Sequence, residues 1–310
     1  MTLTDTREQV HGIMREAQAA LIAGFEEVER EGATCTGLPP GRFDGVTWER
    51  PGGGGGTARV LTEGAVFERA GVNVSAVYGD EAPPSIYQEK PGTRGLPFFA
   101  TGVSMVLHPR NPYAPAFHAN FRYFEAGMER WFGGGMDLTP SYGFEEDARH
   151  FHVTLKAYVE RHGVVDYPTV KDWCDRYFYL PHRHEMRGIG GIFFDDLSLP
   201  DEESFERTLA FVRDGAATIL AAYLPLVRRR LATPYGERER RWQLYRRGRY
   251  VEFNLALDRG TRFGLQTEGD IEAILMSLPP LARWEFRYMP PPGSPEAEMA
   301  RFLVPRDWAG

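Results

Sequence analysis

Polar residues recur at every second position along one central stretch of the chain, and this period constrains the fold more than any other feature. Ser104 and His108 share it in one segment, and His118, Asn120 and Arg122 share it in the next. Successive side chains of a β-strand point to opposite faces of a sheet, so each set lies on one face. If the two segments pair as a hairpin, a serine, two histidines, an asparagine and an arginine line one polar surface.

The opposite face of the second segment carries only alanine and aromatic side chains, which is typical of a strand that packs on a core. The pattern predicts strands over residues 98–107, 116–124 and 129–136, and prolines keep the first connection out of the sheet. The third strand contains three successive glycines and leads to Asp137, and glycine lets a ligand approach the backbone closely. We therefore expect Asp137 and the polar surface to form one site.

The rest of the chain mixes helical and strand patterns without a regular alternation. Helices are predicted over residues 5–31, from Ser141 to Gly163, and over 166–180, 201–231 (interrupted by Pro225) and 269–276. Further strands are predicted over residues 188–197, 250–255 and 261–266. This order favours an α+β fold built on an antiparallel sheet. Because no linker divides the chain, we predict a single domain over residues 1–310, with the helix 5–31 peripheral.

Composition narrows the class of protein. A net charge of −7 argues against a nucleic-acid binder by bulk electrostatics. The two cysteines, Cys35 and Cys174, form no disulfide framework, which suits a reducing compartment. The N-terminus lacks the apolar segment of a signal peptide, and no apolar run approaches the ~20 residues of a membrane span. We expect a cytoplasmic protein without a membrane span.

Several chemistries fit the polar residues that could meet at this site. The residues are His108, His118, Asp137, His152 and His182. Histidines that converge with a carboxylate suit iron, manganese or zinc, although no HExxH or CxxC signature is present. Alternatively, a histidine beside Arg122 can exchange protons with an anionic substrate that the guanidinium binds. A third interpretation is a buried polar network under the sheet. The residues alone leave all three open.

Three other features have a structural explanation that is simpler than a functional one. The glycine run 52–56 lacks the lysine and helix of a phosphate-binding loop, so it predicts a flexible loop at the edge of a pocket. The arginine cluster 238–249 is interleaved with glutamates, which favours a solvated or intersubunit salt-bridge surface. His11 and His184 are predicted to be surface histidines.

Five long blocks of this sequence resemble the oxygen-dependent coproporphyrinogen III oxidases of haem biosynthesis. In chain order they read GVSMVLHPRNPYAPAFHANFRYFE, WFGGGMDLTPSYGFEEDARHFH, KDWCDRYFYLPHRHEMRGIGGIFFDDL, YGERERRWQLYRRGRYVEFNLALDRGTRFGLQT and ILMSLPPLARWEF. The resemblance covers roughly residue 52 to the end. It implies a large flat antiparallel sheet flanked by helices on both faces, and a homodimer formed through about residues 250–285.

The resemblance also implies a reaction, in which two propionates of coproporphyrinogen III are oxidatively decarboxylated to vinyls with dioxygen as co-substrate. His118 would be the proton donor, Asp137 would accept from the pyrrole N–H groups, and Arg122 would pair with a propionate. Substrate would be bound by Ser104, Asn120, Phe121, Arg122 and Gly269. A divalent metal such as manganese is implied on His108, His118, His152 and His182, with no organic cofactor. We expect Arg122→Ala and Asp137→Ala to abolish turnover with modest loss of fold.

One loop departs from the pattern of the family. Where bacterial members often have Gly-Gly-Arg, this chain has Glu268, Gly269 and Asp270, so a basic contact to a carboxylate is replaced by an acidic residue. Two other classes of protein remain alternatives at this stage. One is a metal-dependent oxygenase or hydrolase that uses His108 and His118, and the other is a tetrapyrrole-binding carrier.

Overall fold

A seven-stranded antiparallel sheet organises the computed structural model, which describes residues 3–266 and 269–310. In sequence order the strands are β1 (Asp44–Glu49), β2 (Gly54–Thr62), β3 (Phe67–Gly79), β4 (Phe98–Pro109), β5 (Ala116–Ala126), β6 (Glu129–Thr139) and β9 (Gly190–Ser198). They lie in the same order across the sheet, so five of the six neighbouring pairs are consecutive among the strands, and only β9 joins after an excursion. A separate small hairpin pairs β7 (Tyr179–Leu180) with β8 (Glu185–Met186).

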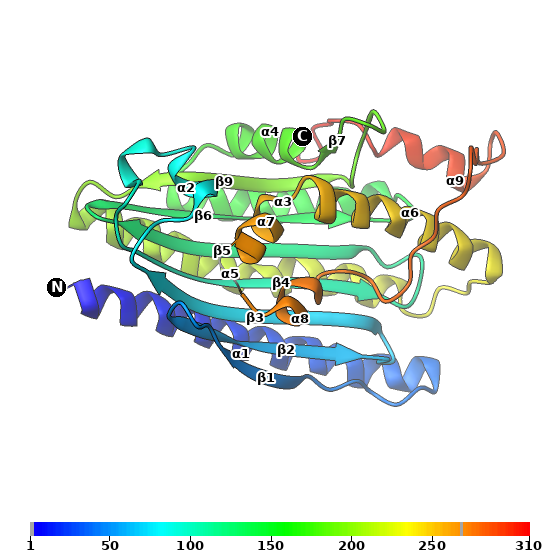
Figure 1. The fold of residues 1–310 in the computed structure, drawn as a ribbon. Coiled ribbons are helices and arrows are strands. Elements are labelled where there is room, and N and C mark those ends of the chain that lie inside the picture. Colours follow the sequence, from blue (N-terminus) through cyan, green and yellow to red (C-terminus); the bar gives the residue numbers. More distant parts are fainter. Residues whose placement is uncertain (1–2, 267–268) are drawn as a thin grey trace.

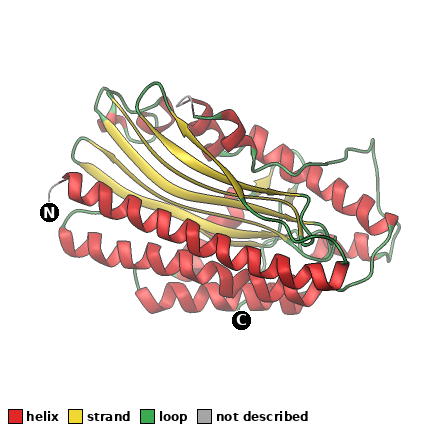
Figure 2. Ribbon diagram, turned by 90° about the horizontal axis from the view of Figure 1, so that it is seen from below, coloured by secondary structure: helices red, strands yellow, loops and turns green. Residues whose placement is uncertain are grey.

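Helices cover both faces of the sheet, which confirms the predicted α+β class (Figure 1). The longer ones are α1 (Leu3–Thr36), α3 (Glu145–His162), α4 (Tyr167–Tyr177), α5 (Glu202–Arg230), α6 (Glu237–Ala256) and α7 (Arg259–Gln266). The short ones are α2 (Pro84–Tyr87), α8 (Ile271–Leu275) and α9 (Pro295–Glu298), with 3₁₀ turns η1 (Pro91–Thr93) and η2 (Met299–Arg301). Three long helices run side by side under one face (Figure 2), and α6, α7 and α8 lie over the other.

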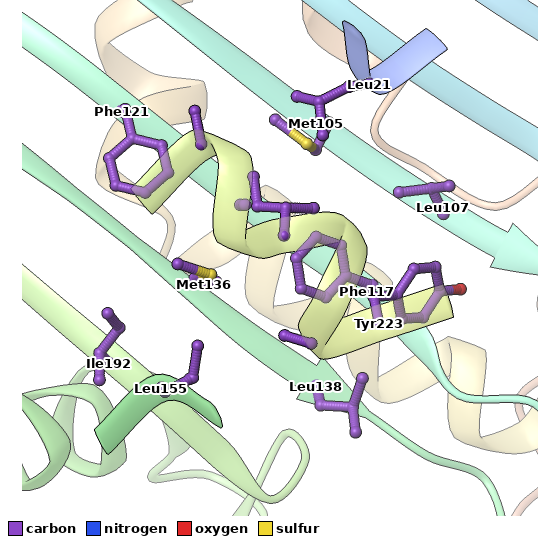
Figure 3. Close-up of a cluster of buried hydrophobic side chains, with 14 of the residues drawn as sticks. Leu21, Met105, Leu107, Phe117, Phe121, Met136, Leu138, Leu155, Ile192 and Tyr223 are labelled. Atoms are coloured by element: carbon purple, nitrogen blue, oxygen red, sulfur yellow. The ribbon is translucent and has the colours of Figure 1, made fainter. Parts of the chain in front are cut away.

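The core lies between the sheet and the layer of α1, α3 and α5. Figure 3 shows side chains of β4, β5, β6 and β9 meeting Leu21 of α1, Leu155 of α3 and Tyr223 of α5. The aromatic face of β5 predicted from the sequence supplies Phe117 and Phe121 to this layer, and both are fully buried. The alternation of β5 therefore directs its polar set to the opposite face, under α6, α7 and α8.

The helix α1 is longer than predicted and belongs to the core instead of lying at its margin. Val10, Leu21, Phe25 and Val28 form a buried stripe on it, and the helix packs on β3, β4 and α5. The C-terminal Trp308 belongs to the same buried cluster. One core thus joins both ends of the chain.

Two predicted strands near the C-terminus are wrong, because residues 250–255 lie in α6 and residues 261–266 in α7. The residues at 250–255 alternate in polarity, but they also fit the spacing of three and four that puts residues on one face of a helix. Tyr250, Phe253 and Asn254 have this spacing and are buried together. Between these two helices Asp258 accepts hydrogen bonds from the backbone N–H and hydroxyl of Thr261 and starts α7.

The glycine run 52–56 and Pro225 also differ from the prediction. The glycine run forms a turn and the first residues of β2, so it is not a flexible loop. A Cβ on Gly56 would collide with the Trp48 ring and the Val74 carbonyl, which explains why glycine is needed there. The helix α5 continues through Pro225 to Arg230 without interruption.

Among the described helices, only α5 is long and apolar enough to span a membrane. In its most apolar window 56% of residues are buried inside the molecule, where α1 and α3 pack against the helix. The burial accounts for its apolar composition as a core helix.

Candidate active site

The predicted hairpin forms, and its polar residues line one face of the sheet with the register that the sequence suggested. Ser104 lies opposite Asn120, and the next polar pair along β5 joins His118 to Asp137 on β6. Neighbouring positions on this face carry small residues: Asn73, Ser75, Gly102, Gly133 and Gly135. A floor made of small side chains, half-exposed on β3, β4 and β5, suits a broad flat ligand lying against the sheet.

The covering helices close this floor at two ends and leave its centre open. At one end Phe263 of α7 packs with Phe124 and Trp131. On the β2–β3 side Met276, which follows α8, packs over Ala58. The polar residues between these contacts keep partial exposure, so a ligand can reach them.

His118 and Asp137 form a hydrogen-bonded pair at the centre of this face. Nδ1 of His118 lies 2.9 Å from Oδ1 of Asp137, whose side chain is 1% exposed, whereas the histidine side chain is 21% exposed. Burial would raise the pKa of Asp137, but the Arg187 guanidinium and the bond to His118 outweigh it and lower that pKa. An ionised carboxylate only accepts, so Nδ1 carries the proton and Nε2 is the nitrogen available to a ligand.

Arg187 holds the other oxygen of Asp137 from inside the protein. Its Nη2 donates to Oδ2 of Asp137 at 2.7 Å, and its Nη1 donates to Asn254 at 3.0 Å. The guanidinium is 1% exposed and lies within 5 Å of the ring centroids of Phe178, Tyr250 and Phe253, at 4.2, 4.5 and 4.7 Å. This aromatic cage fixes the arginine, which fixes Asp137 and through it the ring of His118.

Arg122 lies further along the same face in a second charged group. Its Nη2 donates to Asp195 at 2.6 Å, and its Nη1 donates to Asn120 at 3.0 Å. Asp195 also pairs with Arg259 of α7 at 3.2 Å, and Arg259 reaches Glu89 beyond α2 at 2.9 Å. Two guanidiniums therefore stand at the α7 end of the floor, each tied in place and each partly exposed.

The family model of coproporphyrinogen III oxidase matches residues 9–308, which is nearly the whole chain. The chain belongs to the coproporphyrinogen III oxidase family. Members are oxidoreductases of haem biosynthesis, and their substrate, coproporphyrinogen III, is a broad macrocycle that carries carboxylates. The floor of small residues with partly exposed arginines at one end agrees with such a substrate.

The four histidines implied as metal ligands of this oxidase do not lie together. His108 and His118 share one face, but His152 lies on α3 beyond the opposite face, where its Nδ1 accepts from Tyr167 and its Nε2 donates to the Ile189 carbonyl. His182, in the turn between β7 and β8, bonds Glu252. No group of three histidine, cysteine or carboxylate side chains that could hold a metal occurs within residues 3–266 and 269–310. These four residues therefore do not fit one shared ion in a single chain.

Other residues assigned from the resemblance fall into different places. Ser104 and Asn120 lie on the open floor, whereas the side chain of Phe121 points into the core beside Phe194. Adjacent residues of a strand face opposite ways, so Asn120 and Phe121 cannot both present side chains to substrate. Gly269 donates its N–H to the Gly264 carbonyl and joins α7 to α8.

The loop that departs from the family pattern has a structural role at one position. Asp270 caps α8, because its side chain accepts from the backbone N–H of Ala273 at 2.8 Å. The neighbouring Glu268 lies outside the described residues. An arginine at 270 would lose the cap, so the acidic residue here is explained by local folding.

The arginine cluster was predicted to be a solvated or intersubunit salt-bridge surface, and only part of it is solvated: Arg238 and Arg241 are exposed and paired with glutamates. Arg246, Arg247 and Arg249 are buried, and the first two are paired with Glu185 and Glu68. His11 is also not an exposed residue, because it is half-buried and its Nδ1 lies 3.0 Å from the Thr101 hydroxyl. His184 is exposed, as predicted.

Three residues of the site escaped the sequence interpretation: Arg187, Asp195 and Arg259. Asp195 fell within the predicted strand 188–197 without being singled out, and Arg259 lay between two predicted strands. Arg187 sits in an irregular segment between histidine-rich and glycine-rich runs, where no periodicity marks a face. The pairing of β6 with β9 and the packing of α6 and α7 bring these residues to the site.

Proposed function

We propose that this protein is an oxygen-dependent coproporphyrinogen III oxidase that converts two propionates of its substrate to vinyls, giving protoporphyrinogen IX. Each cycle turns a –CH₂–CH₂–COOH group and one O₂ into –CH=CH₂, CO₂ and H₂O₂. The C–COOH bond and one C–H bond break, and dioxygen accepts the two electrons. The observation that carries the proposal is His118, held by Asp137 at the centre of an open floor with Arg122 nearby.

The roles of the residues follow from their positions. The macrocycle would lie against the small residues of β3 to β6, with one propionate carboxylate at Arg122, which keeps part of its donor capacity free. His118 would exchange a proton with the substrate through Nε2, since Nδ1 is committed to Asp137. The electron-rich pyrrole would supply the electrons that reduce dioxygen. The protein then contributes position and electrostatics.

Asp137 has a different part in this proposal from the one inferred from the resemblance. Both of its oxygens are engaged, by His118 and Arg187, and the carboxylate is buried beneath the floor. It therefore does not fit a direct acceptor for pyrrole N–H groups. We propose that it orients the imidazole and balances the charge that His118 gains when it is protonated.

The expected result in a direct assay is conversion of chemically reduced coproporphyrin III to protoporphyrin when the purified protein and substrate are mixed in air. Products are read by chromatography after oxidation to the fluorescent porphyrins. An anaerobic sample should give none, because dioxygen accepts the electrons. Binding of the porphyrinogen without any vinyl product would contradict the proposal and favour a carrier.

The same assay with and without a chelator tests the implied divalent metal. Since the four histidines do not converge, we expect equal protoporphyrin in both samples. Complete loss of product with chelator, restored by added manganese, would instead mean that an ion is held by ligands drawn from elsewhere.

We also propose a homodimer formed through the segment that begins with the last turn of α6. Large apolar side chains are unusually exposed along it: Leu255, Leu265, Ile271, Leu281, Trp284, Phe286 and Met289. A monomer rarely exposes so many together, and such a patch marks an interface. Tyr250, at the start of the predicted segment, is buried within its own chain, so the proposed surface begins later.

Phe286→Asp is expected to convert the dimer to a monomer, because it places a charge on a side chain that is 90% exposed within this apolar patch. Molar mass from light scattering after size exclusion measures the change. The control is Met128→Asp, which alters a 95% exposed residue between β5 and β6, outside the segment. A dimer that persists in Phe286→Asp, or a monomeric wild type, would contradict the proposal.

Finally, we propose a cytoplasmic location. Both cysteines, Cys35 and Cys174, are free thiols, which fits a reducing compartment.

A further inference from the structure

A small cavity lies beneath α6, at the end of the sheet next to the candidate active site. His108, Gln243, Arg246, Arg247 and Tyr250 contribute to its walls, and its volume is about 20 Å³. A space of this size holds one or two water-sized groups. The walls are rich in cationic and polar side chains, so a dry cavity would be costly.

Arg246 brings unused hydrogen-bond donors to this cavity. The residue is 4% exposed, and only its Nη1 has a carboxylate partner, Glu185 at 2.8 Å. Its Nε and Nη2 are buried without a hydrogen-bond partner among the residues that the structure describes. Leaving two donors of a buried guanidinium unpaired is expensive, and a ligand that accepts both bonds would remove that cost.

Positive charge is also in excess around the cavity, because each nearby carboxylate is shared. The pairs are Arg240–Glu68, Arg247–Glu68, Arg246–Glu185 and Arg249–Glu185, with N···O distances of 2.6, 2.6, 2.8 and 3.6 Å. Glu252 lies 3.6 Å from Arg249, but Arg183 already binds both of its oxygens. Within the described chain, the buried arginines thus have fewer negative partners than they need.

We propose that this cavity binds one small monovalent anion, for which chloride is the model, between Arg246 and Arg247. Free N–H groups and excess positive charge supply the attraction, and the volume excludes polyatomic anions such as methanesulfonate. His108 adds no charge, because burial lowers its pKa to about 3. Its Nε2 donates to the Ser277 carbonyl, so its Nδ1 is a bare acceptor that suits a water molecule beside the anion.

The first test is thermal unfolding of the full chain while chloride replaces methanesulfonate at constant ionic strength. The wild type should show a saturable rise in Tm of roughly 2 to 4 °C. Arg241→Met should keep this response, since Arg241 is an exposed residue of the same helix paired with Glu285. Arg246→Met should lose it. An equal response to both salts, or a response retained in Arg246→Met, would overturn the proposal.

A second test needs no variant and so does not depend on whether Arg246→Met folds. Crystals of the wild type grown or soaked in bromide should show an anomalous peak in the cavity within hydrogen-bonding distance of Arg246. Ordered water there without an anomalous signal would overturn the proposal. Neither test involves turnover, so their outcome is independent of the proposed oxidase activity.

Discussion

The variant His118→Asn is expected to lose turnover by on the order of 10²- to 10⁴-fold while keeping its fold. The asparagine amide nitrogen occupies the position of Nδ1 and can donate to Asp137, so the buried carboxylate keeps its partner. It cannot give or take a proton, and this is the function that we assign to His118. The measurement is the rate of protoporphyrin formation, with thermal unfolding of the same samples recorded in parallel.

Two further readouts separate proton transfer from positioning. If His118 transfers protons, its variant should also lose one limb of the pH profile of kcat/KM. A variant that keeps more than a tenth of wild-type turnover at unchanged Tm would show that the histidine is not the proton carrier. Loss of folding would instead support the interpretation of the residue as part of a structural polar network.

Asp137 is a poor residue for this experiment, for a reason that only the structure reveals. Removing its charge leaves Arg187, which is 1% exposed, without a carboxylate partner. Breaking such a buried pair costs about 3–5 kcal/mol. We therefore expect Asp137→Ala to lose stability as well as turnover, instead of the modest loss of fold that the sequence suggested.

Acid is expected to destabilise the wild type much more steeply than the variant His152→Gln. Burial, with a smaller effect from Lys171, lowers the pKa of His152 to about 3, although its bond to the Ile189 carbonyl acts in the opposite direction. Burial and Arg247 likewise lower the pKa of His108 to about 3. Both histidines are therefore neutral in the folded protein at pH values where the unfolded chain, with a pKa of about 6.5, is protonated.

The sign follows from proton binding. Below pH 6.5 the unfolded state binds more protons than the folded state, so the stabilisation is complete above that pH and is lost as the pH falls toward 3. Each histidine then contributes about 1.4 kcal/mol per pH unit to the slope of the unfolding free energy. Urea unfolding at several pH values between 7.5 and 4.5 measures that slope.

The glutamine at position 152 can replace both hydrogen bonds of the histidine, since it accepts from Tyr167 and donates to Ile189. We therefore expect the variant to keep its stability at pH 7.5. The slope of its unfolding free energy against pH should be smaller by about 1.4 kcal/mol per pH unit, the contribution of one histidine. The control is the exposed His184, whose replacement His184→Asn should leave the slope unchanged. Equal slopes for wild type and His152→Gln would contradict the assigned protonation state.

Periodicity predicted the parts of the structure in which one face meets the core and the other does not. The hairpin of β4 and β5, the aromatic core face of β5 and the polar set with His118 and Arg122 all follow from a period of two. The same argument failed at residues 250–255, because they continue α6, in which Arg246, Arg247 and Arg249 are buried just before this stretch and charge does not mark the outside of the helix. A buried arginine gives the same sequence signal as an exposed one.

The sequence by itself determined the sheet class, the family and the face on which His118, Asn120 and Arg122 lie, because strand alternation is a local property of the backbone. Tertiary structure decided which residues support that face. Arg187, Asp195 and Arg259 come from distant segments, and their roles depend on charge pairing across β6, β9 and the covering helices. It also separated His152 from the other histidines by the thickness of the sheet. Such distances depend on packing in three dimensions, which no spacing along the chain records.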